Sequence, residues 1–286
     1  MESESFAGIA LARVFSASIF NELANKGYSP TLKSLSLELD LPLNNFKNLS
    51  ELFEFAYRTL SKVYRNEYLY KNTIANKILL GRHSINTAAM LSEFRVANSK
   101  ADAVILNGTI HIYEIKTELD SLERLDQQIE DYLKFAEFVS VVADGKHIPK
   151  LEGYLPEYIG LIEFTNKDTL RVHRKAISNV TNLDLAVIFD SLRKDEYVSI
   201  INAYYDYVPK VPNTLIYKEC KVLFLAMPLH AAYSLVLKTL KLRANSKLDK
   251  DFVLKAPKSL KVPLLCTDLT KKQINNLSSA LGGGII

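Results

Sequence analysis

Three charged residues in the middle of the chain have the types and spacing that suit hydrolysis assisted by a metal ion. Asp102 lies in the apolar segment ADAVIL, and Glu114 and Lys116 flank Ile115 in the next one, TIHIYEIK. Two converging carboxylates repel each other unless a cation lies between them, and hard oxygen ligands suit Mg²⁺ or Mn²⁺. Such a metal polarises a phosphoryl oxygen, and a neighbouring lysine can orient water. The alternative is a charged strand end whose side chains are merely solvated.

The two acids meet only if the turn between these segments has the right length. Asn107-Gly108 is a strong hairpin signal between two strands. Because successive side chains of a strand alternate faces, a loop of those two residues alone would place Asp102 opposite Tyr113. Glu114 would then lie on the far side of the sheet, and the site would not exist.

A three-residue turn gives a better register. If residues 107–109 form the turn, with the glycine in the left-handed conformation, Leu106 pairs with Ile110 and Asp102 lies opposite Glu114. A slip by one residue would scatter the apolar side chains of the hairpin over both faces. We therefore predict a three-residue turn or an equivalent bulge. The apolar side chains that it gathers on one face are Val104, Leu106, Ile110 and Ile112.

The segment that follows, SLERLDQQIEDYLKFAEF, has the spacing of a helix, with Asp120 and Glu123 predicted to cap its start. Gln128 and Tyr132 are four residues apart and share a face of this helix. We expect both side chains to lean toward the sheet and the charged cluster. They lie next to a stripe predicted to be buried, formed by Leu125, Ile129 and Leu133.

Taken together, these residues resemble the PD-(D/E)XK nuclease superfamily, and especially its exonuclease-like branch. The resemblance rests on Asp102, then Glu114-Ile115-Lys116, then Gln128 and Tyr132 at Gln-x-x-x-Tyr spacing. Within that superfamily, residues 93–144 are similar to a small family of bacterial and phage-borne proteins of largely unassigned role. The helical flanks are supported only loosely.

The resemblance implies a divalent metal, Mg²⁺ or Mn²⁺, bound by Asp102 and Glu114, with the carbonyl of Ile115 as a further ligand. Glu93, expected on a preceding helix, would supply the extra acid that many members use; a lone helical glutamate is otherwise solvated. The proline that names the motif is absent, since Ala101 precedes the first acid. That position varies widely in the superfamily, so the departure bears little on the chemistry.

The resemblance also implies roles for the remaining motif residues. Lys116 would be the catalytic lysine. Gln128 and Tyr132 would help to orient the lysine, the water or the DNA strand. The five histidines are scattered, and none pairs with a second ligand at helical or turn spacing.

Apolar periodicity divides the chain into three regions. Residues 1–80 repeat apolar side chains at three and four, which predicts a helical N-terminal region. Residues 81–176 change to period two, and VSVVAD, YIGLIEFT and TLRVHR are further strands of an α/β core. Residues 177–286 are again mostly helical, with a break at Pro209 and Pro212. The resemblance implies a restriction-endonuclease-like mixed sheet in the core.

Two further segments could contact nucleic acid. TLKSLSLELDLP is similar to a helix-turn-helix, but it contains no turn glycine and few basic residues, so we do not favour DNA reading by it. Residues 238–261 carry eight Lys or Arg and two Asp. They could follow a phosphate backbone or form a solvated helix face and loop.

Composition sets broad limits on the class of protein. The 286 residues are 48% hydrophobic and carry a net charge of +4, which tolerates a polyanionic partner without demanding one. Cys220 and Cys266 lack the spacing of a zinc site and are expected to be reduced. No apolar run approaches the ~20 residues of a membrane span, and the acidic start lacks the basic region of a signal peptide. We expect a soluble cytoplasmic protein.

The leading hypothesis is a Mg²⁺-dependent or Mn²⁺-dependent hydrolase that cleaves DNA, an endonuclease or an exonuclease, in repair, mobile-element maintenance or defence. A nuclease-like fold retained as a nucleic-acid-binding or protein-interaction module without cleavage is the alternative, and RNA is a further possible substrate. The intact acid and lysine positions favour the enzyme. The sequence leaves the oligomeric state open, a homodimer included.

Overall fold

The computed structural model describes residues 8–41 and 45–283. The chain divides into two compact units. The helical unit comprises residues 1–85, 166–170 and 246–286, and the sheet unit comprises residues 86–165 and 171–245. The region 177–286 is therefore shared between the two units. Of the N-terminal region 1–80, residues 1–7 and 42–44 lie outside the described residues.

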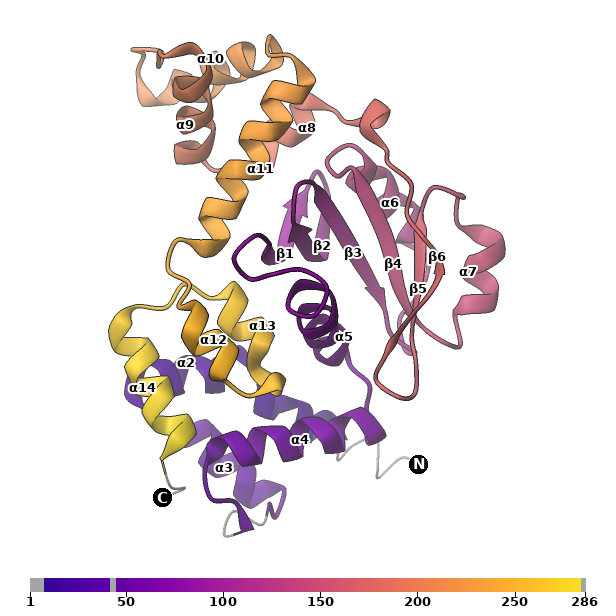
Figure 1. Cartoon of the computed structure of the whole chain (residues 1–286), viewed down its shortest axis with the longest axis vertical. Coiled ribbons are helices and arrows are strands. Elements are labelled where there is room, and N and C mark those ends of the chain that lie inside the picture. The colour runs from indigo at the N-terminus through magenta and orange to yellow at the C-terminus, as the bar shows by residue number, and fades with distance from the viewer. Residues whose placement is uncertain (1–7, 42–44, 284–286) are drawn as a thin grey trace. The chain divides into compact units, whose positions relative to one another are not determined.

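The helical unit consists of short helices (Figure 1). Side chains at the N-caps accept hydrogen bonds from free backbone N–H groups; Ser29 and Asn48 do so for α3 and α4. The apolar side chains of α4 that recur at three and four, such as Leu52 and Leu60, are fully buried. The elements are η1 (Arg13–Phe15), α2 (Ala17–Lys26), α3 (Pro30–Glu38), α4 (Leu49–Val63), α5 (Glu67–Ile74), the π-helix η3 (Ala75–Leu79), α12 (Lys250–Lys255), η5 (Lys258–Leu260), α13 (Lys261–Cys266) and α14 (Lys271–Gly282).

A mixed six-stranded sheet runs in chain order from β1 to β6 (Figure 1). The first three strands form antiparallel pairs, whereas β3, β4 and β5 are parallel. The alternation of apolar residues that predicted strands in this part of the chain is confirmed. The strands are β1 (Ala89–Val96), β2 (Ser99–Leu106), β3 (Ile110–Lys116), β4 (Phe138–Asp144), β5 (Gly160–Phe164) and β6 (Leu170–Arg174).

The β2–β3 turn has the predicted length. Leu106 pairs with Ile110, Gly108 has a φ of +73°, and the Asn107 N–H donates to the Thr109 carbonyl at 3.0 Å. Continued by one step, this register places Asp102 opposite Glu114. The four apolar side chains of the hairpin predicted to share a face are all completely buried; they are Val104, Leu106, Ile110 and Ile112.

Helices of the sheet unit cover the face of the sheet to which these side chains belong, and together they form one core. The connection from β3 to the parallel strand β4 runs through α6 (Leu125–Leu133). Beside β5 lies α7 (Ile148–Tyr154), which the sequence did not lead us to expect (Figure 1). The remaining helices are α8 (Leu185–Asp190), α9 (Lys194–Tyr205), α10 (Asn213–Leu225) and α11 (Leu229–Asn245), and the predicted break at Pro209 and Pro212 lies between α9 and α10.

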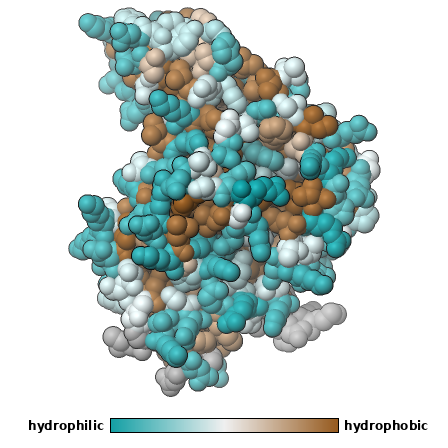
Figure 2. Space-filling model, in the orientation of Figure 1, coloured by the Kyte–Doolittle hydropathy of each residue, from teal (hydrophilic) through white to brown (hydrophobic). Residues whose placement is uncertain are grey.

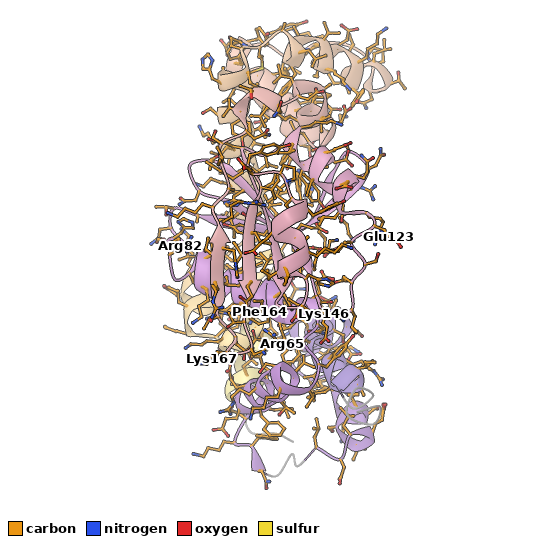
Figure 3. The ribbon with its side chains drawn as sticks, turned by 90° about the vertical axis from the view of Figure 1, so that its right-hand side faces the viewer. Arg65, Arg82, Glu123, Lys146, Phe164 and Lys167 are labelled. Atoms are coloured by element: carbon orange, nitrogen blue, oxygen red, sulfur yellow. The ribbon has the colours of Figure 1, made fainter. Side chains whose placement is uncertain are left out.

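The predicted cap of α6 is wrong. The helix begins at Leu125, and the Asp120 carboxylate instead accepts from the backbone N–H and the hydroxyl of Thr117, both at 2.7 Å. Glu123 is exposed and points away from the protein (Figure 3). Asp120 bonds to the loop three residues before it because short polar side chains readily bond to nearby backbone.

Neither cysteine forms a disulfide, and Cys220 is buried. Among the described residues, no helix combines the length and the apolar character that crossing a membrane requires.

Candidate active site

A buried ion pair marks the C-terminal end of β3. Glu114 is 2% exposed and Lys116 is 6% exposed. The Lys116 Nζ donates to Glu114 Oε1 at 2.9 Å and to Gln128 Oε1 at 2.8 Å. The two residues share a face because they are two apart on one strand. A buried charge pair with well-made hydrogen bonds holds the ammonium group in one position.

Helix α6 supplies the other two members of this cluster. Gln128 Nε2 donates to Glu114 Oε1 at 2.6 Å, and the Tyr132 hydroxyl donates to Glu114 Oε2 at 2.8 Å. The prediction that these two side chains lean toward the charged residues is therefore confirmed. We call Glu114, Lys116, Gln128 and Tyr132 the β3–α6 cluster.

Tyr132 is held in its protonated form. Burial of the side chain, reinforced by the neighbouring Glu114 carboxylate, raises the pKa of Tyr132 far above its ordinary value. The hydroxyl therefore remains a hydrogen-bond donor to Glu114 over the physiological pH range. Tyr132 accordingly positions the carboxylate and does not act as a base.

The second carboxylate of the motif reaches the same strand from β2. Asp102 is half-buried, and its Oδ2 accepts from the Ile115 N–H at 2.7 Å. Asp102 therefore contacts the backbone of the residue that separates the two charges of β3. The predicted site residues from Asp102 to Tyr132 thus gather within two strands and one helix of the sheet unit.

Glu93 lies in β1 and not on the helix expected from the sequence. The ladder pairs on either side of it place it across from Asp102, and one carboxylate oxygen of each lies within 4.8 Å of the other. Its φ of +55° is unusual for a residue with a side chain. Glu93 also forms an ion pair with Lys100. A helix was the wrong expectation, because Glu93 lies in a strand that pairs with β2 and alternates polar and apolar residues only in its second half, EFRV.

The donors around Asp102 are compatible with a hard divalent cation. Asp102 and Glu93 offer carboxylate oxygens close together, the type of ligand that hard cations prefer, although the Lys100 ammonium already pairs with Glu93. Glu114 would have to share an oxygen that now accepts from Lys116, Gln128 or Tyr132. The residues therefore fit Mg²⁺ or Mn²⁺ in donor type, with Glu114 as the ligand that must rearrange.

The loop that follows Lys116 is held by a histidine that the sequence did not single out. His147 Nε2 lies 2.9 Å from the Thr117 carbonyl, so this nitrogen carries the proton and donates. Lys146, which Figure 3 labels, donates to the Glu118 carbonyl at 3.4 Å. Both come directly after β4, whose C-terminal end lies beside that of the parallel strand β3. In the sequence, these two residues could have been found only by their position after a strand, because no spacing relates them to another ligand.

Residues 61–278 match the model of a family described as bacteriophage P4 protein cII. The chain belongs to the P4 cII family. Protein cII of Enterobacteria phage P4 is 29% identical over 143 residues, which are 48% of this chain and 50% of that protein. The chain thus spans about half the length of this curated relative.

A Silicibacter pomeroyi protein of unknown function is similar in structure with a TM-score of 0.30 and 17% identity, over 37% of this chain and 68% of that one. The cII family match takes in every strand of the sheet and the whole β3–α6 cluster. The cluster is therefore part of the region by which the chain belongs to the family.

Proposed function

We propose that this cII-family chain is a metal-dependent nuclease that hydrolyses phosphodiester bonds of DNA. The observation that carries the proposal is the Lys116 ammonium, held by Glu114 and Gln128 on a strand whose register places Asp102 opposite Glu114. Acidic residues and a lysine at this spacing are the equipment for metal-assisted hydrolysis.

The order of elements supports a restriction-endonuclease-like core, which is part of the same proposal. An antiparallel meander of β1, β2 and β3 is followed by α6 and by β4, parallel to β3. This order puts Asp102, Glu114 and Lys116 on the neighbouring strands β2 and β3, with Gln128 and Tyr132 on the connecting helix.

We assign the metal to Asp102 and Glu114, with Glu93 and the carbonyl of Ile115 as further ligands. When bound, Mg²⁺ or Mn²⁺ would polarise a phosphoryl oxygen and lower the pKa of a bound water. Asp102 is kept in place for this role by its hydrogen bond from the Ile115 N–H.

The chain's own groups orient the water and stabilise the charge that develops on the phosphate. Of the three N–H groups of the Lys116 ammonium, the described residues accept two, and the third can point at water or at a phosphoryl oxygen. Gln128 fixes the direction of the ammonium because its amide links Lys116 and Glu114. Tyr132 holds the second oxygen of Glu114.

Incubation of the full chain with single-stranded, duplex and branched DNA and with RNA, in Mg²⁺ or Mn²⁺, tests the proposal. We expect cleavage of DNA, reduced by about 10³-fold or more in Asp102→Ala and in Lys116→Ala. Gln127→Ala, on the exposed side of α6, is the control and should cleave normally. If both site variants still cleave DNA at the wild-type rate, the assigned active centre is wrong.

A module without cleavage is the second candidate, and one observation favours it. The carboxylate of Glu114 accepts from three protein donors and is almost fully buried, so the β3–α6 cluster is satisfied as it stands. Such a network can stabilise the fold without taking part in catalysis. DNA binding by a folded wild-type protein that leaves all of these substrates intact would select this candidate.

A further inference from the structure

The net positive charge of the chain belongs to the helical unit and not to the sheet unit that contains the candidate active site. The ranges of the helical unit contain 18 Lys or Arg and 12 Asp or Glu, whereas those of the sheet unit contain 18 and 20. A nucleic acid is attracted mainly through its phosphates, and the strength of this attraction depends on local cationic charge. The helical unit is therefore the better candidate for holding a nucleic acid.

Two helices of this unit are joined by a three-residue turn. Helix α2 ends at Lys26, Gly27 follows with a φ of +78°, and α3 begins at Pro30. Two helices connected by so short a turn that contains a glycine have the connection of a helix-turn-helix. The sequence pattern TLKSLSLELDLP contains no turn glycine because Gly27 stands before it, and few of its residues are basic; the helix-turn-helix connection lies between α2 and α3 and not within this pattern.

The corner between α2 and α3 is built to be rigid. The Glu22 carboxylate of α2 accepts from the Ser29 hydroxyl at 2.5 Å, the Thr31 N–H at 3.1 Å and the Thr31 hydroxyl at 2.9 Å. Ser29 in turn caps α3 by accepting from the Leu32 N–H at 3.0 Å. A fixed corner presents α3 in one orientation, which recognition of a duplex requires.

The outer face of α3 combines polar side chains with one large exposed apolar side chain. Leu32 and Leu35 are buried, whereas Lys33 and Ser34 are exposed. Leu37, 75% exposed, lies on the same helix. A lysine and a serine can contact phosphates or base edges, and an exposed leucine can contact the methyl group of thymine.

Helix α14 adds basic charge beside α2 (Figure 1). Gln273 and Asn276 donate to Asn25 in the last turn of α2. Lys271 and Lys272 are the first two residues of α14 and are exposed. Cations there oppose the helix dipole, so they do not serve the stability of α14. The sequence of α14 contains no Asp or Glu, and Figure 2 shows hydrophilic surface on the side of the unit where α14 lies.

The acids of α2 and α3 do not cancel this charge. Glu22 is committed to the corner, and Glu38 accepts from Arg13 at 2.8 Å. Asp40, exposed after α3, is the remaining acid of this segment. Against them stand Lys26, Lys33, Lys271 and Lys272, all exposed. Both α3 and the first turn of α14 adjoin the C-terminal end of α2, because α3 follows it after residues 27–29 and Gln273 donates to Asn25. We call the exposed residues of α3 and of this first turn the α3–α14 surface; its lysines are complementary in charge to a phosphate backbone.

We infer that duplex DNA docks on the α3–α14 surface, with α3 in the major groove and the lysines of α14 on the flanking phosphates. B-form DNA has a major groove roughly 12 Å wide that admits an α-helix, whereas the major groove of A-form RNA is deep and narrow. The geometry therefore favours DNA over duplex RNA. This binding is separate from cleavage and does not depend on the β3–α6 cluster.

Fluorescence anisotropy of a labelled 25-base-pair duplex with the full chain in EDTA tests the inference, because no divalent metal is present for cleavage. The slope of log affinity against log salt should become shallower by about 2 in Lys271→Ala/Lys272→Ala and by about 1 in Lys33→Ala. These exposed changes should leave the fold intact, which circular dichroism checks.

The matched control removes two exposed lysines of the same unit that lie outside residues 238–261, Lys62→Ala/Lys77→Ala, on α4 and η3. Its salt slope should equal that of the wild type. If the salt slope becomes equally shallower in both double variants, DNA is attracted by net charge alone, and the assigned surface is wrong. Binding of duplex RNA with the same affinity and the same sensitivity to Lys33→Ala would overturn the assignment of the major groove.

Discussion

Strand β3 carries polar side chains on both faces, and the two faces differ in kind. One face ends in Glu114 and Lys116, which bond to α6. On the other, His111 Nε2 lies 2.8 Å from the Ser140 hydroxyl, and the Tyr113 hydroxyl lies 3.1 Å from His111 Nδ1. A serine, a histidine and a hydroxyl that orients the histidine, linked one to the next by hydrogen bonds, resemble a nucleophile and its base.

Most side chains of both sets are buried, and the sets differ in charge and in the exposure of the residues beside them. Ser140 is 2% exposed, and a Cβ added to Gly160 on β5 would lie 2.2 Å from its hydroxyl, so backbone closes around the oxygen. His111 stacks on Tyr113 at 4.1 Å, which fixes its ring. The β3–α6 cluster instead joins both signs of charge and adjoins the partly exposed Asp102 and Glu93. The proposed site thus differs from this second set of residues by its charges and by the more exposed acids beside it.

The largest expected effect separates the two faces by stability. Glu114→Gln removes the charge partner of a buried lysine, which typically costs about 3–5 kcal/mol. Ser140→Ala removes one neutral hydrogen bond from His111 and should cost about 1 kcal/mol. Urea unfolding measures both free energies of unfolding. Similar losses would mean that the ion pair contributes no more than the neutral contact.

Gln128→Ala should reduce cleavage rather than substrate binding. Without the amide, the Lys116 ammonium loses one of its two hydrogen bonds, and a misplaced group can lower kcat by about 10²-fold. Gln127→Ala is the matched control, because Gln127 donates to the buried Asp131 at 3.2 Å and not to the cluster. It should change stability by about 1 kcal/mol and leave kcat unchanged. Steady-state kinetics of both variants distinguishes them, and an equal fall in kcat would contradict the role of Gln128.

The two faces of β3 also show which features of the fold and of the site could be predicted from the sequence. Period-two alternation and the glycine of the turn predicted the register of β2 and β3, because a one-residue slip would have exposed the apolar face. Helical spacing placed Gln128 and Tyr132 beside the lysine. Short-range bonds were mispredicted: Asp120 was assigned to a helix cap with Glu123, but its carboxylate bonds to Thr117, which is equally near along the chain.

Long-range placement was the other limit. The residues before Glu93 do not alternate, so the strand was not predicted, and the position of Glu93 opposite Asp102 depends on the pairing of β1 with β2. His147 became visible only when β4 was known to lie parallel to β3. Gly27 lies before the segment TLKSLSLELDLP, so the turn between α2 and α3 was not predicted from it. These residues meet through pairing and packing that no local spacing records.

Tyr132→Phe should change how stability depends on pH. At neutral pH the variant loses one donor to Glu114 and should be less stable by about 1–2 kcal/mol. Tyrosines of the unfolded chain ionise near pH 10, whereas the raised pKa of Tyr132 keeps it protonated in the folded state.

The stability that this tyrosine contributes is therefore complete below about pH 10 and is lost as the pH rises further, by about 1.4 kcal/mol per unit. The difference between wild type and Tyr132→Phe should shrink between pH 10 and 11, measured by urea unfolding at each pH. A constant difference over this range would contradict the raised pKa.

The smallest effect concerns the turn that aligns the acids. A Cβ at Gly108 would have no atom within 4 Å, so Gly108→Ala should destabilise only through its φ of +73°, by about 1 kcal/mol. Gly108→Asn should cost less, because asparagine tolerates the left-handed conformation. Thermal unfolding compares the two variants. The order alanine below asparagine below glycine is what a left-handed residue in a three-residue turn requires, and equal stability of all three would mean that the residue is not held there. In that case the burial of the apolar face of the hairpin, and not the turn, would fix the register that places Asp102 opposite Glu114.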